Sequence, residues 1–357
     1  MIPFIQPDLT EKEAQATYDT VLSGFVNEGQ LAQKFGNKFA KAVGTKYAIP
    51  TTNCTSAITI ALMALGIRDK EVIVPDITMI GTAMGVVLSG NIPVVVDVKM
   101  ENACIDPQEV KKAIGDNTAA IIPVHYNGRN AITEELIQIA NNHGLALIED
   151  AAGCLGSCSE GENSFQIGTK GEFGCFSLAS TKIAVSGQGG VLVTNDKSLY
   201  EKATRFKDWG RFKTKSITHA SIGFNFKFTD IQAAIALVQL ERLPKLIQRK
   251  RQVYGLYKDK IKNQMFSINN HPGYCPWYVE LKNQEYQIIL KANNIGCTSI
   301  WPALHQQPAM EKFVESNDQL FPNASKLANK ILWLPSSTKL LDEEIDYICN
   351  IIINKNV

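Results

Sequence analysis

The chain has 357 residues, of which 45% are hydrophobic and 20% charged, so it can bury a large core and is not expected to be disordered. Its formal net charge of +1 gives no support for a nucleic-acid partner or for a basic membrane-binding face. The length is typical of two domains, or of one large domain with an appendage.

The eight cysteines include no C-x-x-C pair, and Cys154 and Cys158 are too isolated from histidines to suggest a zinc site. We therefore expect no bound metal and interpret the cysteines as small buried residues in a reducing compartment. Residues 1–5 lack the charged and apolar segments of a signal peptide, and no run is long and apolar enough to cross a bilayer. These features predict a cytoplasmic protein that is not bound to a membrane.

The first segments of the chain predict two amphipathic helices and a strand. Residues 11–22 and a segment ending near Val43 have apolar residues at helical spacing, on either side of a loop at 25–30. A short strand at 47–50 runs into a hydroxyl-rich cluster at 51–56, which opens an apolar helix. Such a cluster can simply cap the helix, which is the more common outcome, or it can bind an anion at the helix N-terminus. It contains more hydroxyls than capping needs.

Four further segments, at 71–75, 93–98, 119–125 and 145–150, are predicted to be buried strands, with helices from about Thr78 and over 133–143. Strands that alternate with helices predict parallel β-α units and an open α/β sheet. Ligands of such sheets bind beyond the carboxyl ends of the strands. The hydroxyl cluster, the turn at 76–79, His125 and Asp150 all follow strand ends, so we expect them to meet at one edge of the sheet.

The stretch at 174–182 is a short apolar run that ends in Lys182, ahead of a glycine-rich turn at 186–190. A lysine is useful for covalent chemistry when burial or nearby cations keep its amine partly neutral. Together with Asp150 it suggests a pyridoxal phosphate site, in which the amine bonds to the cofactor and the carboxylate pairs with the ring nitrogen. Taken alone, Lys182 could be a surface lysine and Asp150 a helix cap; the strand-end argument favours the cofactor site.

The second half begins with a predicted strand at 190–194, a helix at 197–206 and a long polar loop from residue 208. Asp230 is expected to cap a long helix that is bent or broken at Pro244. Two strand candidates follow, at 277–281 and 297–301, with helices near 284–293, 324–331 and 342–353. We predict a large cofactor-binding domain over residues 1–240 and a smaller α+β domain over 241–357.

These segments, in this order, resemble the DegT/DnrJ/EryC1/StrS family of sugar aminotransferases. The resemblance covers nearly the whole chain and is carried by SGFV at 23–26, TNCTSA at 52–57, VIVP at 72–75, PVH at 123–125, EDAA at 149–152, FSLASTK at 176–182, GG at 189–190, GFNFK at 223–227 and WPALH at 301–305. It implies a fold-type-I α/β architecture, with a mostly parallel central sheet flanked by helices and a smaller C-terminal α+β domain. It also implies a pyridoxal phosphate enzyme that acts on nucleotide-linked keto-deoxysugars and forms homodimers with shared active sites.

The resemblance also implies roles for individual residues. Lys182 matches the Schiff-base lysine that later shuttles protons, and Asp150 matches the aspartate that keeps the pyridine nitrogen protonated. The other cofactor contacts that it implies are Thr55, Ser56 and Ser177 on the phosphate, Asn225 reaching that phosphate from the neighbouring subunit, and Met79 against the ring. Contacts to the nucleotide sugar are expected at Phe25, Asn27, Glu28, His125, Trp301 and His305.

Two positions depart from the family pattern. Met79 stands where an aromatic ring usually stacks on the cofactor, and a thioether is a weaker substitute. Gly153 stands where glutamine or glutamate is usual, so water or another side chain must fill its place. Both departures leave open a cofactor-binding protein without turnover, in a regulatory role.

Members of the family that dehydrate the sugar have histidine in place of Lys182, so its presence here favours amino transfer. We expect the amino group to pass from glutamate to a keto group of a nucleotide-linked 4-keto-6-deoxyhexose. C4 is the first choice for the position of that group, and C3 is the alternative.

Overall fold

The structure, a computed structural model, describes residues 1–161, 164–212 and 216–354, and its centre is a seven-stranded sheet. The strand order is β1-β7-β6-β5-β4-β2-β3. The strands are β1 (Tyr47–Thr51), β2 (Glu71–Pro75), β3 (Ile92–Val96), β4 (Thr118–Ile121), β5 (Ala146–Asp150), β6 (Phe173–Ser177) and β7 (Gly190–Thr194). Strand β7 pairs antiparallel with both β1 and β6, and the other pairs are parallel. The predicted α/β fold with a mostly parallel sheet is confirmed.

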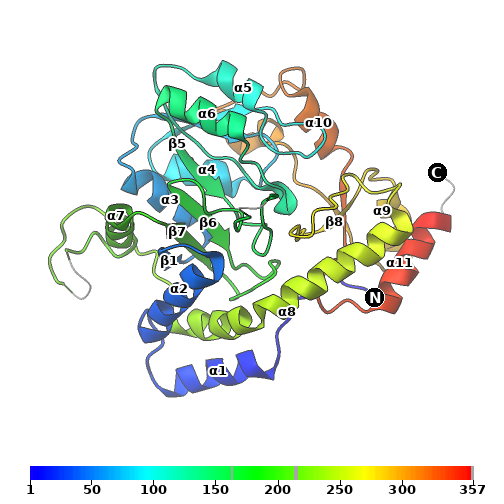
Figure 1. Ribbon diagram of the computed structural model, residues 1–357, viewed down its shortest axis with the longest axis horizontal. Coiled ribbons are helices and arrows are strands. Elements are labelled where there is room, and N and C mark those ends of the chain that lie inside the picture. Colours follow the sequence, from blue (N-terminus) through cyan, green and yellow to red (C-terminus); the bar gives the residue numbers. More distant parts are fainter. Residues whose placement is uncertain (162–163, 213–215, 355–357) are drawn as a thin grey trace.

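Helices cover both faces of this sheet (Figure 1). They are α2 (Gln30–Val43), α3 (Cys54–Ala64), α4 (Gly81–Leu88), α5 (Pro107–Ala113), α6 (Glu134–His143), α7 (Lys197–Lys207) and α8 (Asp230–Ile261). Side chains alternate along a strand, so successive residues of β7 pack on opposite faces of the sheet. Leu192 packs in the core that contains α3, whereas Val191 and Val193 pack in the core that contains α2 and the start of α8.

A second, three-stranded sheet lies in the C-terminal part, in the order β8-β10-β9. Its antiparallel strands are β8 (Val279–Leu281), β9 (Thr298–Ser299) and β10 (Leu332–Leu334), accompanied by α9 (Tyr286–Ala292), α10 (Pro322–Ala328) and α11 (Asp342–Asn354). Helix α8 connects the large sheet with this part and contains Pro244 without ending there (Figure 1). Because α8 runs across residue 240, the division into domains at that position stays a prediction.

The start of α8 differs from the expectation. Thr229 is the N-cap residue, and its side chain forms a capping box with Gln232. The Asp230 carboxylate instead accepts hydrogen bonds from the backbone N–H groups of Gly29, Leu31 and Ala32, at 2.8, 3.2 and 2.9 Å. Asp230 therefore caps α2 rather than its own helix, which is favourable because a carboxylate stabilises the positive end of a helix dipole.

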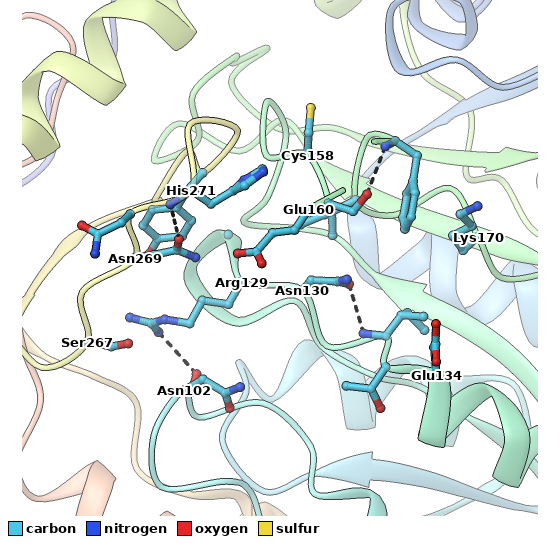
Figure 2. A pocket seen from close by; sticks show the side chains of 18 of the residues that line it. Asn102, Arg129, Asn130, Glu134, Cys158, Glu160, Lys170, Ser267, Asn269 and His271 are labelled. Carbon is cyan, nitrogen blue, oxygen red and sulfur yellow. Dashed lines mark hydrogen bonds between the residues drawn. The ribbon is translucent and has the colours of Figure 1, made fainter. Parts of the chain in front are cut away.

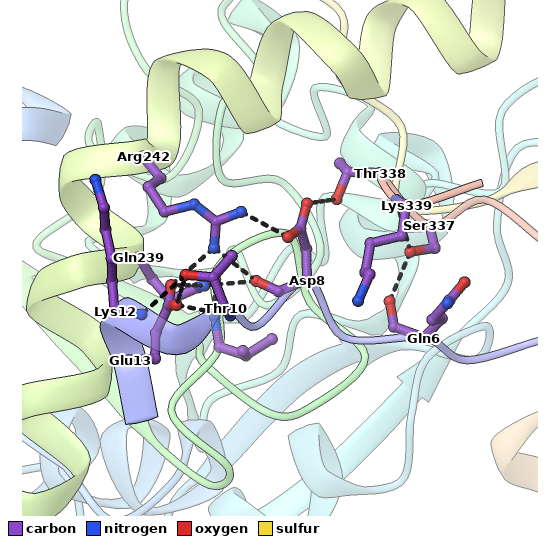
Figure 3. A network of polar contacts seen from close by, with 11 residues as sticks. Gln6, Asp8, Thr10, Lys12, Glu13, Gln239, Arg242, Ser337, Thr338 and Lys339 are labelled. Atoms are coloured by element: carbon purple, nitrogen blue, oxygen red, sulfur yellow. Dashed lines mark hydrogen bonds and ion pairs between the residues drawn. The ribbon is translucent and has the colours of Figure 1, made fainter. Parts of the chain in front are cut away.

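The N-terminal segment is tied to α8 and to the C-terminal part by a polar network (Figure 3). Arg242 pairs with Asp8 at 2.6 Å and with Glu13 of α1 (Glu11–Leu22) at 2.7 Å, and Asp8 also accepts a hydrogen bond from Thr338. Burial alone would raise the pKa of Glu13, but hydrogen bonds from Thr10, Arg242 and other groups outweigh it and lower that pKa to about 2. The network directly follows residues 4–5, which line the cavity described next.

Candidate active site

A cavity of about 540 Å³ opens at the carboxyl ends of the central strands. Asp150 and Ser177 are the last residues of β5 and β6, and both line it. The predicted site residues that it brings together are Thr55, Met79, His125, Asp150, Ser177, Lys182 and Trp301. The meeting of polar residues at one edge of the sheet, expected from the strand ends, is therefore seen in the structure.

The N-terminus of α3 faces this cavity through Thr55. The Asn53 side chain caps the helix by accepting a hydrogen bond from the Ser56 N–H at 2.8 Å, and the Ser56 hydroxyl lies 3.0 Å from both Asn53 Oδ1 and Thr52 Oγ1. Ser56 thus lies behind the cavity wall. A Cβ atom on Gly190 would lie 2.3 Å from the backbone of Asn53, so glycine is needed for β7 to pass so close to this helix start.

The Asp150 carboxylate is buried and held by two donors. Oδ2 accepts from the Thr82 hydroxyl at 2.7 Å, and Oδ1 accepts from the Ala152 N–H at 3.0 Å. An ionised carboxylate has about four acceptor positions, and these two bonds use two of them. The others remain available to a donor in the cavity. The arrangement can hold a protonated nitrogen of a ligand ring.

The Lys182 amine lies against the face of Trp277, with Nζ 3.0 Å from the ring centroid. Burial lowers the pKa of Lys182 to about 7, while Cys54 and Asp150 oppose that shift. At pH 7 about half of such amines are neutral, compared with about one in 3,000 for a lysine of ordinary pKa. The structure therefore supplies a nucleophilic amine beside a fixed carboxylate.

From this lowered pKa we predict how chemical modification of Lys182 depends on pH in the cofactor-free protein. Because the neutral amine is the nucleophile, reductive methylation of Lys182 by formaldehyde and cyanoborohydride should be half-maximal near pH 7 and level off above it. Quantifying the modified peptide by mass spectrometry across pH 5–10 measures the midpoint, with the exposed Lys339 as the internal reference for an ordinary lysine. A Lys182 midpoint near 10 would contradict the buried amine.

Met79 and His125 both line the cavity, but they differ in exposure and in hydrogen bonding. Met79 is 45% exposed, and its sulfur accepts a hydrogen bond from the Gly81 N–H at 3.1 Å. His125 is buried, with Nε2 2.8 Å from Glu149 and Nδ1 accepting from the Ala131 N–H. The ring nitrogens of His125 are thus engaged within the protein, whereas the Met79 side chain remains free to pack against a ligand.

The remaining predicted residues lie elsewhere in this chain: Phe25, Asn27, Glu28, Ser56, Asn225 and His305. Phe25 is 79% exposed, and Asn225 is also exposed, while the rings of its sequence neighbours Phe224 and Phe226 stack on each other. Glu28 pairs with Lys207 at 2.5 Å, and the Asn27 side chain accepts from the Glu28 N–H. A single chain does not bring these residues to the cavity.

His305 lies in the interior and is not among the residues that line the cavity. Its side chain is fully buried, with Nδ1 2.6 Å from Asp76 and Nε2 2.8 Å from Asp318. Burial opposes the charged ring, but the hydrogen bonds to both carboxylates outweigh it and raise the pKa of His305. His305 therefore fastens the C-terminal part to the turn after β2 and does not line the cavity in this chain, so its contact with the nucleotide sugar stays a prediction.

A larger cavity, of about 820 Å³, lies away from these residues (Figure 2). It is bordered by the loop around Arg129 and by the segment with Asn269 and His271, and Arg129 is held by Glu280 and by the Asn102 carbonyl. It contains no residue of the predicted site. Size alone therefore does not mark the candidate site; the Lys182 amine and the fixed Asp150 carboxylate favour the smaller cavity.

The sequence did not single out Thr82, Trp277 or Cys54, which also line the site. Thr82 lies on α4, one turn after Thr78, and only the fold shows that its hydroxyl meets Asp150. Trp277 comes from the C-terminal part, 95 positions after Lys182, so no local pattern connects them. In the described residues, no cluster of His, Cys, Asp or Glu could hold a metal, and no helix is long and apolar enough to span a membrane.

The chain is similar in sequence and in fold to known proteins. The chain is 33% identical over 362 residues to a GDP-perosamine synthase of Escherichia coli O157:H7, covering 98% of this chain and 97% of that protein. A GDP-perosamine synthase of Vibrio cholerae is 30% identical, with 99% of each chain covered. The structure of a DegT DnrJ EryC1 StrS aminotransferase from Brucella abortus superposes with a TM-score of 0.88 at 26% identity, covering 96% of this chain and 95% of that one.

The match to a family model runs over residues 7–353, which confirms the family expected from the sequence. The chain belongs to the DegT/DnrJ/EryC1/StrS aminotransferase family.

Proposed function

We propose that the protein is a pyridoxal phosphate-dependent aminotransferase that acts on a nucleotide-linked 4-keto-6-deoxyhexose. The observation that carries the proposal is the pairing of a half-buried Lys182, whose amine lies against the Trp277 ring and has its pKa lowered to about 7, and a fixed Asp150 carboxylate in one cavity at the strand ends. The family membership supports the same class of reaction.

The residues present fit this cofactor. Thr55, the free N–H groups at the start of α3 and the Ser177 hydroxyl would hold its phosphate, because a helix N-terminus favours an anion. Asp150 would hold the proton on the ring nitrogen, and Met79 would pack against the ring. When bound, the cofactor supplies an aldehyde for amino groups and a ring that accepts electrons. Lys182 would hold the cofactor covalently through its amine, and in the free state it would move protons to and from the substrate carbon.

For the substrate, we favour a C4 ketone on a GDP-linked sugar. Both curated relatives described above are named GDP-perosamine synthases, and each matches over nearly its whole length. A C3 ketone remains the alternative. Glutamate is proposed as the amino donor, and the cytoplasmic location stays a prediction.

The test has two parts, both followed by absorbance of the bound cofactor. Glutamate should convert the yellow enzyme to its colourless amino form, and one member of a panel of GDP-, UDP- and dTDP-linked 3-keto and 4-keto sugars should restore the colour. NMR of the product then shows which sugar carbon carries the new amino group. If glutamate and the other common amino acids leave the spectrum unchanged, the protein is a cofactor-binding protein without turnover.

The active site is proposed to be shared between two subunits. Lys182 is the one cationic side chain among the described residues that line the cavity, whereas a nucleotide sugar, glutamate and the cofactor all carry negative charges. The segments that carry Phe25 and Asn225 lie side by side, because Glu28 accepts hydrogen bonds from Lys207 and from the Phe228 N–H. Their exposed polar and apolar side chains are suited to a partner, and a two-fold interface is the commonest kind.

Replacing Asn225 with alanine should weaken cofactor retention without unfolding the chain. In the proposed dimer the Asn225 side chain donates to the phosphate in the partner's site, and a hydrogen bond to a charged group contributes about 1.5–3 kcal/mol. The dissociation constant of the cofactor should therefore rise by about 10- to 150-fold. Dialysis followed by absorbance titration measures it, with thermal unfolding of the cofactor-free protein as the control. Unchanged retention would count against the shared site.

Mixing the Asn225→Ala and Lys182→Ala variants gives a sharper test. In a heterodimer one site carries both changes and the other carries neither, so activity at limiting cofactor should rise above that of either variant alone. Sedimentation should show a dimer. A fully active monomer, or subunit exchange without recovery, contradicts the arrangement.

A further inference from the structure

The space next to Gly153, beside the cavity, is filled by the side chain of Trp277. A Cβ atom at this position would lie 3.1 Å from Cε3 of Trp277, so the indole occupies the volume into which a longer side chain would project. Gly153 does not have a positive φ, so the backbone itself does not require glycine. Any side chain at this position would therefore crowd the neighbouring indole.

The indole is held in a defined orientation. Its Nε1–H donates to the backbone carbonyl of Thr181 at 2.8 Å, directly before Lys182. The ring also packs against Tyr278, Trp301 and Trp333, with centroid separations of 4.9, 5.6 and 5.5 Å. These contacts leave one face for the Lys182 amine, whose Nζ lies 3.0 Å from the ring centroid.

We propose that Trp277 is a positioning residue for Lys182: its indole face holds the ε-amine beside the cavity whenever that amine is not bonded to the cofactor. The proposal rests on the proposed function in one respect, since an aminotransferase must release this amine and use it again. It adds a residue from the C-terminal part to the site and accounts for the absence of a side chain at Gly153.

An aromatic face suits an amine that must both carry and give up a proton. It attracts the ammonium form weakly, whereas a carboxylate in the same place would stabilise that form strongly and remove the neutral nucleophile. The other ionisable groups near the amine are Cys54 from α3, Asp150 from β5 and Cys154 from the loop after β5. Burial raises the pKa of both thiols well above the ordinary value, so they stay neutral at pH 7. Lys250 from α8 borders a small adjoining cavity together with Lys182.

The test is the pH titration of Lys182 by reductive methylation in cofactor-free protein. Trp277→Leu keeps an apolar side chain but removes the aromatic face, so the midpoint should fall by about one pKa unit. Trp277→Phe keeps a face and should lower it by less. Trp301→Leu is the matched control, because it removes an indole that supports Trp277 but does not lie over the amine; its midpoint should shift less than that of Trp277→Leu. Lys250 is followed in the same samples and should not shift.

A second pair of variants tests the coupling with Gly153. Gly153→Gln should displace the indole and lower the midpoint, and the double variant with Trp277→Leu should shift no further than Trp277→Leu alone, because both changes remove one contact. A Trp277→Leu midpoint that is unchanged, raised or matched by Trp301→Leu overturns the proposal, as do additive shifts in the double variant. The titration needs no cofactor turnover, so failure of the proposed aminotransferase would be seen separately, as an unchanged spectrum with amino donors.

Discussion

Lys182→Ala is expected to abolish amino transfer while the protein still folds and still binds pyridoxal phosphate without a covalent bond. Proton transfer by a positioned side chain contributes about 10²–10⁴ in rate, and loss of the covalent attachment adds to that deficit. The fold should survive because the substitution shortens a half-buried side chain and leaves no buried polar group unpaired. The groups that hold the phosphate, at the start of α3 and at Ser177, are unchanged.

The decisive measurement is turnover with glutamate and a keto sugar, together with cofactor binding by equilibrium dialysis. Borohydride reduction of the wild-type protein should place the cofactor label on the peptide that contains Lys182. Lys250 is a matched comparison within the same chain, because burial also lowers its pKa, to about 8, and it borders the adjoining cavity. A label on Lys250, or substantial transamination by the Lys182→Ala variant without added amines, would show that the assignment of the lysine is wrong.

Much of the site could be predicted because its residues follow strand ends. Thr55 and Asp150 each lie where a predicted strand gives way to a helix or loop, and parallel strands bring such positions to one edge. The local patterns also gave helices α1 and α2 nearly to the residue. The helices follow from short-range periodicity and the strand-end positions from the rule for the edge of a parallel sheet, whereas Ser177 was expected only from the family resemblance.

The parts that were missed depend on contacts between distant segments. Asp230 caps α2 from about 200 positions away, so its own neighbourhood suggested an ordinary helix start. His305 was expected at the substrate because it lies in the WPALH segment, yet two carboxylates hold it in the interior. Strand β10 (Leu332–Leu334) is too short to give a periodic signal and is defined by pairing with β8 and β9.

Trp277 shows why a departure from a sequence pattern needs the fold for its interpretation. The sequence marks Gly153 as the loss of a polar side chain, which favours weaker activity or none. In the structure, the indole of Trp277 fills the space and contacts the Lys182 amine. The replacement comes from another part of the chain and is aromatic instead of polar, so comparison of single positions does not find it.

Asp150→Asn should bind the cofactor and lose most of its activity. The Asp150 oxygens accept from the Thr82 hydroxyl and the Ala152 N–H, and a carboxylate can make both bonds and still hold a proton on the ring nitrogen of a ligand. An amide has one acceptor oxygen and no charge, so it serves one donor and leaves the ring nitrogen unprotonated. Removing one partner of a buried charge pair costs about 3–5 kcal/mol. If that cost falls on the transition state, turnover drops by about two to four orders of magnitude.

Thr82→Val is the matched comparison, because it keeps the Asp150 charge and removes only the hydroxyl that orients the carboxylate. A single hydrogen bond to a charged group is worth about 1.5–3 kcal/mol, so its loss of turnover should be smaller than that of Asp150→Asn. Single-turnover rates with glutamate, measured at saturating cofactor, separate the two effects from weaker binding. Near-normal turnover of Asp150→Asn would show that this carboxylate only caps the turn after β5, since the charge on the ring nitrogen would then be held by some other group.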